Sequence, residues 1–127
     1  MRSGPDQGFV PGRHLVDAYG NGGFRFAEMS HRGSILALPS GIRAWAPRRA
    51  ADITPESVDP ILADAAEIDF VLVGTGLEIS AVADAVRRRL SEAGLGIDIM
   101  QTGAAARTYN ILVAENRKVA AALIAVD

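Results

Sequence analysis

The fold is decided by the stretch Phe70-Val71-Leu72-Val73-Gly74-Thr75-Gly76, a continuous apolar run that ends in two glycines around a threonine. An apolar run without polar alternation is typical of a strand that is covered on both faces, as in a parallel sheet. The next segment, residues 80–93, has apolar residues at helical spacing, with Ser80 as the expected N-cap and Gly94 as the stop. We therefore predict a buried strand near 70–73 followed by an amphipathic helix.

The same alternation of strand and helix continues to the end of the chain. Residues 97–100 predict a second strand, residues 102 to about 115 a second helix, and residues 119–126 a last strand. Connections between parallel strands through a helix are almost always right-handed. The C-terminal half is thus predicted to be a β-α-β-α-β unit, a small parallel sheet with helices packed on it.

The segments upstream of residue 70 have the pattern of an antiparallel sheet. Apolar residues flank Gly20-Asn21-Gly22-Gly23 and predict a hairpin over residues 14–27, because Asn and Gly tolerate positive φ. Residues 34–38 and 41–46 alternate around a second turn and predict two more strands. We expect this region to form an N-terminal antiparallel hairpin region beside the parallel unit.

Prolines and glycines mark the remaining boundaries. Pro60 interrupts a helix start, so the element around residues 61–66 should be short. Residues 1–13 contain glycine and proline without apolar periodicity, which predicts a mobile N-terminal arm. Residues 14–127 are then a single domain, as expected for a chain of 127 residues.

The composition excludes several classes of chemistry. The chain has no cysteine, so thiolate catalysis and cysteine-ligated zinc are excluded. His14 and His31 are its only histidines, so a metal site would have to rest mainly on carboxylates. We expect neither a metal nor a cofactor.

The distribution of charge and apolar residues narrows the expected partners. The net charge is −2 and the arginines form no broad stripe, so nucleic acid is not favoured. No stretch approaches the roughly 20 apolar residues that span a bilayer, and the N-terminus has no apolar signal core. We expect a soluble, cytoplasmic product without membrane insertion; its oligomeric state stays open.

Two motifs follow predicted strands, at the edge of an α/β sheet where ligands usually bind. Gly74-Thr75-Gly76 has the glycines of a phosphate loop, but Ile79 stands where a dinucleotide motif needs another glycine, so a tight turn is favoured. Thr102 opens the second helix, on which Arg107 and Asn110 share a face. These side chains form either a ligand site or ordinary helix packing, and packing is favoured.

Neither a nucleophilic site nor a paired-acid site stands out. His31 lies near Ser34, yet there is no nucleophile elbow and no third partner. Trp45, on a predicted strand, is either an exposed anchor or a packed aromatic, with packing favoured. We expect no catalytic residues.

The chain resembles the small proteins built on the Mth domain, long labelled a domain of unknown function. The motifs that carry the resemblance are Val71–Gly76 and Met100–Leu112, supported by Gly22–Phe26 and the Ile42–Trp45 strand. The resemblance implies a three-layer α/β fold with a mixed central sheet. The family includes an assembly factor of the mitochondrial NADH dehydrogenase (complex I), which implies a protein partner rather than a substrate.

Two functions are compatible with the sequence. The first is a non-catalytic protein-binding or assembly-factor-like module, related to respiratory complex I, whose partner is another protein. The second is a small-anion or nucleotide-binding protein or enzyme at the carboxyl edge of the parallel strands. The candidate binding surface in either case consists of Gly74, Thr75, Gly76, Thr102, Arg107, Asn110 and Trp45.

Overall fold

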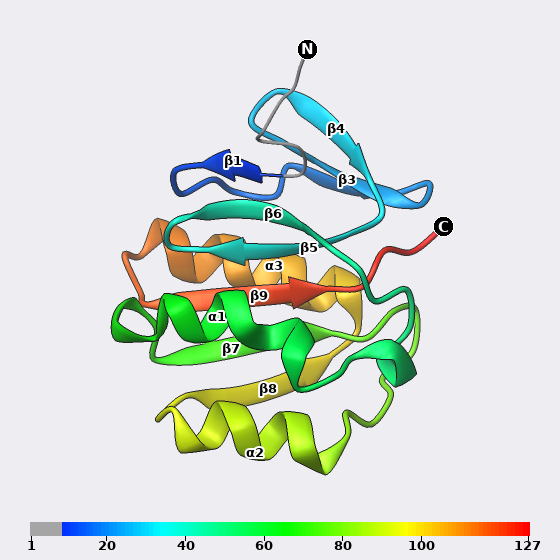
Figure 1. The fold of residues 1–127 in the computed structure, drawn as a ribbon. Helices are drawn as coiled ribbons and strands as arrows, with labels where there is room; N and C mark the ends of the chain where they lie inside the picture. The colour runs from blue at the N-terminus through cyan, green and yellow to red at the C-terminus, as the bar shows by residue number, and fades with distance from the viewer. Residues whose placement is uncertain (1–8) are drawn as a thin grey trace.

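A mixed six-stranded sheet forms the centre of the computed structural model, which describes residues 9–127 (Figure 1). Its strand order is β1-β6-β5-β9-β7-β8. Pairing is antiparallel from β1 to β9 and parallel from β9 through β7 to β8. The bounds are β1 (Phe9–Pro11), β5 (Ser34–Leu38), β6 (Gly41–Trp45), β7 (Phe70–Gly74), β8 (Gly96–Met100) and β9 (Val119–Leu123).

A second, three-stranded antiparallel sheet consists of β2 (Ala18–Gly20), β3 (Gly23–Phe26) and β4 (Met29–Arg32). The turn between β2 and β3 has positive φ at Asn21 (53°) and Gly22 (81°), as a two-residue hairpin turn requires. The predicted hairpin is therefore confirmed, and so are the strands predicted at 34–38 and 41–46.

The helices are α1 (Asp59–Ala63), α2 (Asp84–Glu92) and α3 (Thr102–Ala114), with 3₁₀ turns η1 (Ala50–Asp52), η2 (Glu56–Val58) and η3 (Ala65–Glu67). Pro60 lies in the first turn of α1, which is short as predicted. The predicted start of α2 is wrong by four residues. Ser80 does not cap the helix, since Ala83 occupies the N-cap position; the Ser80 N–H donates a hydrogen bond to Thr75 Oγ1 (3.0 Å) within the preceding loop.

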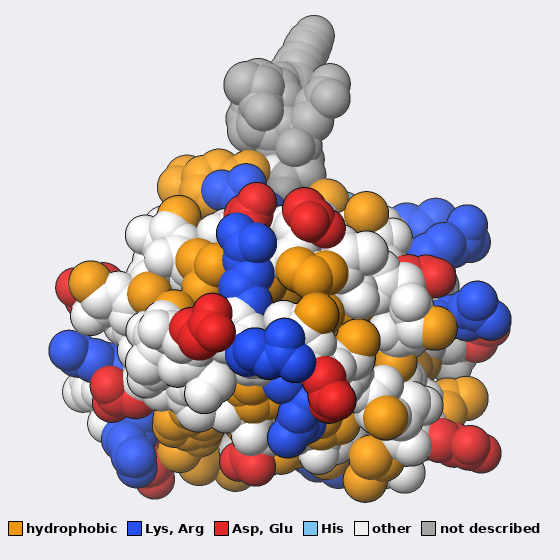
Figure 2. Space-filling view, turned by 60° about the horizontal axis from the view of Figure 1, so that its bottom comes forward, with side chains coloured by type: hydrophobic (Ala, Val, Ile, Leu, Met, Phe, Trp, Pro, Cys, Tyr) orange, Lys and Arg blue, Asp and Glu red, His pale blue; other side chains and the backbone are white. Residues whose placement is uncertain are grey.

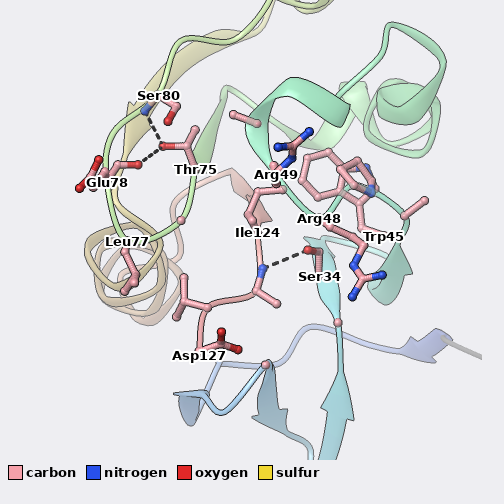
Figure 3. Close-up of a pocket in the computed structure, with 18 of the residues that line it drawn as sticks. Ser34, Trp45, Arg48, Arg49, Thr75, Leu77, Glu78, Ser80, Ile124 and Asp127 are labelled. Carbon is pink, nitrogen blue, oxygen red and sulfur yellow. Dashed lines mark hydrogen bonds between the residues drawn. The ribbon is translucent and has the colours of Figure 1, made fainter.

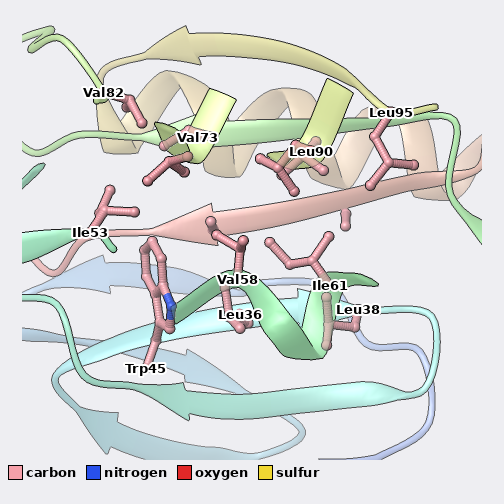
Figure 4. Close-up of a cluster of buried hydrophobic side chains, with 14 of the residues drawn as sticks. Leu36, Leu38, Trp45, Ile53, Val58, Ile61, Val73, Val82, Leu90 and Leu95 are labelled. Carbon is pink, nitrogen blue, oxygen red and sulfur yellow. The ribbon is translucent and has the colours of Figure 1, made fainter. Parts of the chain in front are cut away.

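Alternate side chains of the central strands point to opposite faces of the sheet and pack in the two hydrophobic clusters that separate the three layers. On β9, Ala120 and Ala122 contribute to the hydrophobic cluster beneath α1 and α2, which Figure 4 shows, whereas Ala121 and Leu123 face the cluster beneath α3 and the small sheet. The β7 residues divide between the two clusters in the same way. The prediction of a three-layer α/β domain with a mixed central sheet and a C-terminal β-α-β-α-β unit is confirmed.

The inner end of the predicted N-terminal arm belongs to the sheet. Residues 1–8 of that arm lie outside the described residues. Residues 9–11 form β1 and pair with β6, and the Arg43 guanidinium lies 4.9 Å from the centre of the Phe9 ring. Arg13 donates a hydrogen bond to the Val119 carbonyl (2.7 Å). Residues 9–13 of the predicted arm therefore contact the sheet, and a three-residue strand is too short to produce apolar periodicity in the sequence.

Residues 9–127 contain no helix that combines the length and the apolar character needed to cross a bilayer.

Candidate functional site

An open cavity of about 820 Å³ lies at the edge of the sheet where β7 and β9 end (Figure 3). One wall is the chain that follows β6, from Trp45 to Ala50, and the other is the loop that follows β7, from Thr75 to Ser80. Residues 124–127, which follow β9, lie between these walls together with Ser34 at the start of β5. We call this cavity the edge pocket. Its position agrees with the usual location of ligand sites in open α/β sheets.

Four of the predicted site residues meet beside the edge pocket. The Gly76 N–H donates to Thr102 Oγ1 (2.9 Å), and the Thr102 hydroxyl donates to the Ile124 carbonyl (2.7 Å). A Cβ at Gly74 would lie 2.8 Å from the Thr102 Cα, so glycine allows α3 to begin against the end of β7. The Thr75 N–H donates to the Met100 carbonyl (3.0 Å). Because these groups bind one another, they hold the turn together and offer no open cradle for an anion.

Thr75 also fixes the loop that follows β7. Its buried hydroxyl donates to the Glu78 carbonyl (3.0 Å) and accepts from the Ser80 N–H (3.0 Å). The loop thereby holds Leu77 and Ile79 in solvent, with 69% and 66% of their surface exposed. These two side chains are the most exposed large hydrophobic residues in the described part of the chain.

Arg107 and Asn110 lie elsewhere, along α3 beside the segment that leads into β2. They line a separate cavity of about 280 Å³ together with residues 16–19. The Asn110 side chain accepts from the Val16 N–H (2.8 Å) and donates to the Val16 carbonyl (2.7 Å), and Arg107 donates to the Tyr19 hydroxyl (3.3 Å). The structure therefore separates this pair from the glycine turn, and Asn110 acts as a clamp on the backbone.

Trp45 is buried, with 7% of its surface exposed, so the alternative of an exposed anchor is wrong. Its indole N–H donates to the Ser57 carbonyl (2.9 Å), and its ring packs in the cluster beneath α1 (Figure 4). The side chain nevertheless lines the edge pocket as part of its wall.

The charged residues of the edge pocket were not among the predicted site residues. Arg48 and Arg49 are exposed on its wall, and both of their backbone N–H groups donate to Asp52 Oδ2 (3.1 Å each). In the sequence, Arg48-Arg49 is a short run of arginines with nothing beside it that marks a site. Only the sheet order, which places the end of β6 near the end of β7, shows that it borders a cavity.

The edge pocket has charges of opposite sign on different sides. Arg48 and Arg49 come from the wall after β6, whereas Glu78 comes from the opposite wall (Figure 3). Asp127, from the chain after β9, lies near a third lining arginine, Arg32, because a Cβ at Gly22 would lie 3.8 Å from Asp127 Oδ1 and 3.7 Å from Arg32 Nη1. The described lining residues include no histidine, and residues 9–127 contain no cluster of three or more acids and histidines that could hold a metal ion. The chemistry offered is therefore charge pairing and apolar contact.

Charges are more evenly mixed on the face that contains α2 and β8. Figure 2, in which the lower side of the molecule comes forward, shows basic, acidic and hydrophobic side chains interspersed there.

The core contains a titratable group whose pKa is shifted, the hydroxyl of Tyr109 on α3. Burial raises the pKa of the Tyr109 hydroxyl, against the lowering effect of the Arg13 guanidinium, and this hydroxyl donates to the His14 carbonyl (3.3 Å).

Comparison with known proteins identifies the family. A family model described as a protein of unknown function (DUF498/DUF598) matches residues 16–124. The chain belongs to this family. An uncharacterised protein of Rhodobacter capsulatus is 32% identical over 109 residues, which cover 86% of this chain and 82% of the relative.

Other relatives of the DUF498 chain carry a functional name. The NADH dehydrogenase [ubiquinone] 1 alpha subcomplex assembly factor 3 of Mus musculus is 29% identical over 93% of this chain. The match covers 64% of that assembly factor, less than two thirds of its length. The resemblance expected from the glycine and helix motifs is thus confirmed.

Solved structures agree with the fold. A crystal structure of a Bartonella henselae protein described as an outer membrane protein is 48% identical with a TM-score of 0.88, covering 92% of this chain and 98% of that one. The solution structure of a Mth938-like domain from Bordetella pertussis is 28% identical with a TM-score of 0.77, covering 100% of this chain and 94% of that one.

Proposed function

We propose that this domain is a non-catalytic protein-binding module that acts in the manner of an assembly factor. The observation that carries the proposal is the ordered loop from Thr75 to Ser80, which holds Leu77 and Ile79 in solvent beside the edge pocket. Exposed apolar side chains on a rigid loop are suited to binding a partner, because little conformational entropy is lost when they become buried.

The name shared by several relatives supports the class of partner. Those relatives are assembly factors of the NADH dehydrogenase alpha subcomplex, at 28 to 30% identity. We extend the proposal to this chain as an assembly role related to a respiratory complex. The cavity residues support this choice over catalysis, since their buried hydroxyls at Ser34 and Thr75 are engaged within the chain.

The test is affinity capture of the tagged full-length protein from its own cells. Wild type is compared with Leu77→Asp/Ile79→Asp, and with Ile111→Asp as the matched control. Ile111 is also 60% exposed but lies on α3 and does not line the edge pocket. We expect wild type and the control to recover the same respiratory-complex subunits or assembly factors, and the double variant to lose them.

Truncation of an interface anchor typically costs about 2 kcal/mol of binding or more, which is enough to remove a partner in capture. Each variant is first melted, so that a loss of fold is separated from a loss of binding. Recovery of an unchanged set by all three proteins, or of background alone by wild type, would contradict the proposed function.

A further inference from the structure

We propose that the edge pocket binds an extended segment of a partner protein that carries an acidic side chain for Arg48 and Arg49 and a basic side chain for Glu78. This inference rests on the proposed function and specifies the chemistry of the partner. A cavity of about 820 Å³ lies in the upper part of the range of pockets that bury drug-sized ligands, so it accommodates a few side chains of such a segment.

The basic wall is held in place before any partner arrives. Asp52 Oδ2 accepts hydrogen bonds from the backbone N–H groups of both arginines (3.1 Å each), and the indole of Trp45 is bonded to Ser57 (2.9 Å). Pro47, between Trp45 and the arginines, is buried. The backbone from 45 to 52 is therefore fixed while both guanidinium groups remain exposed.

The acidic side is fixed in a similar way. The Glu78 carbonyl is bonded to Thr75 Oγ1 (3.0 Å), and the Val126 carbonyl accepts from the Gly22 N–H (2.8 Å), which places Asp127 next to the β2–β3 turn. Figure 3 shows the Glu78 carboxylate across the cavity from the Arg48 guanidinium, whereas Asp127 lies between the two walls, near Arg32. A ligand with one charge of each sign can therefore contact both sides at once.

These charges are not neutralised across the cavity. Among residues 9–127, the ion pairs within 4.0 Å are Arg49–Asp52 and Arg89–Asp59, and the first of these lies at the limiting distance of 4.0 Å. Neither pair joins Arg48 or Arg49 to Glu78 or Asp127. Electrostatic complementarity to a bipolar segment is thus available at this surface.

The geometry favours a polypeptide over a free small anion. A small-molecule site usually has a few polar groups that converge inside it. Here the buried hydroxyl of Ser34 accepts from the Ala125 N–H (3.0 Å), and that of Thr75 is engaged in its loop. What remains available is exposed charge together with exposed Leu77, an arrangement suited to a longer ligand that contacts both the pocket and its rim.

The experiment selects binders from a displayed library of random dodecapeptides on the immobilised full-length protein, then measures the selected peptides by fluorescence polarisation. We expect sequences with an acidic and a basic residue at a recurring spacing and an apolar residue between or beside them. The variant Arg48→Glu/Arg49→Glu should weaken such peptides by about tenfold, because each reversal removes an attraction and adds a repulsion.

Two further variants test whether the selected peptides bind at the edge pocket through paired charges. Glu78→Lys should weaken the same peptides, and changing the basic residue of the peptide to Glu should restore binding to this variant. Arg87→Glu/Arg88→Glu on α2 has the same charge change outside the edge pocket, and it should leave the affinity within twofold of wild type. Arg48→Gln/Arg49→Gln replaces the reversal variant if that protein fails to melt cooperatively.

Several results would overturn the inference. They are the absence of any selected peptide, selected peptides without paired charges, and equal weakening by the α2 control. Displacement of the peptide by millimolar succinate or inorganic phosphate would assign the pocket to a small anion instead. Peptides that respond to Leu77→Asp/Ile79→Asp but not to Arg48→Glu/Arg49→Glu would refute the charge pairing while leaving the proposed protein-binding function intact.

Discussion

Replacing Thr102 with valine tests how the edge of the sheet is held together. The two side chains have nearly the same shape, and Thr102 is fully buried, so the change removes the hydroxyl without leaving a cavity. It deletes the hydrogen bond to the buried Ile124 carbonyl (2.7 Å) and the one from the partly buried Gly76 N–H (2.9 Å). The first group would be left unsatisfied in the core.

An unsatisfied buried group costs about 1–3 kcal/mol, and a lost bond at a partly exposed group about 0.5–1.5 kcal/mol. We therefore expect Thr102→Val to lower the free energy of unfolding by about 2–4 kcal/mol, which lowers Tm by about 10 °C in a domain of this size. Urea unfolding followed by circular dichroism measures the loss. Amide exchange at Gly76 should accelerate more than exchange in the middle of β7.

Thr102→Ser is the matched control, because it keeps the hydroxyl and removes one buried methyl group, at a cost of about 1 kcal/mol. Two results would contradict this role of the hydroxyl in joining α3 to the turn after β7. One is a free energy of unfolding of Thr102→Val within about 0.5 kcal/mol of the wild-type value. The other is an equal loss of stability in Thr102→Ser and Thr102→Val.

Three further predictions concern the core and the packing of α3. Burial raises the pKa of Tyr109 above its usual 10.0, so as the pH rises the unfolded chain loses this proton before the folded protein does. The contribution of this group to stability should therefore be full below about pH 10 and fall above it. Tyr109→Phe should remove that part of the fall, as measured by urea unfolding at successive pH values. Gly74→Ala places a Cβ 2.8 Å from the Thr102 Cα and should cost about 1–3 kcal/mol by thermal melting, with an unchanged Tm contradicting the tight fit. Asn110→Ala removes both bonds to Val16 and should cost about 2 kcal/mol, with faster amide exchange over residues 14–19; unaltered exchange there would contradict the clamp.

The elements of the C-terminal half were predictable because a continuous apolar run indicates a buried strand and a helical spacing of apolar residues indicates an amphipathic helix. The apolar run at 70–73 and the helical spacing of Val86 and Leu90 lead directly to β7 and α2, both of which the structure contains. The start of α2 was not predictable from Ser80. A serine caps a helix only where the next residue is already helical, and here the Ser80 N–H is instead bonded to Thr75 Oγ1, five residues earlier in the same loop.

The candidate site was predictable only in part, for a topological reason. Gly74, Gly76 and Thr102 meet because parallel strands end at one edge, which the sequence indicates. The arginine pair at 48–49 reaches the same edge because β9 enters between β5 and β7, and nothing in the local pattern shows that order. Asn110 likewise has the same appearance in sequence whether it contacts water, a ligand or the Val16 backbone.

The central position of β9 has a consequence for biosynthesis. β9 is the strand that joins the β5–β6 hairpin to the β7–β8 pair, yet it leaves the ribosome after all of them. Until residues 119–123 emerge, β5 and β7 each present an unpaired edge, and both hydrophobic clusters lack their alanine-rich middle. The central sheet is therefore expected to form only once residues 119–123 have emerged, rather than in stages as the earlier strands appear.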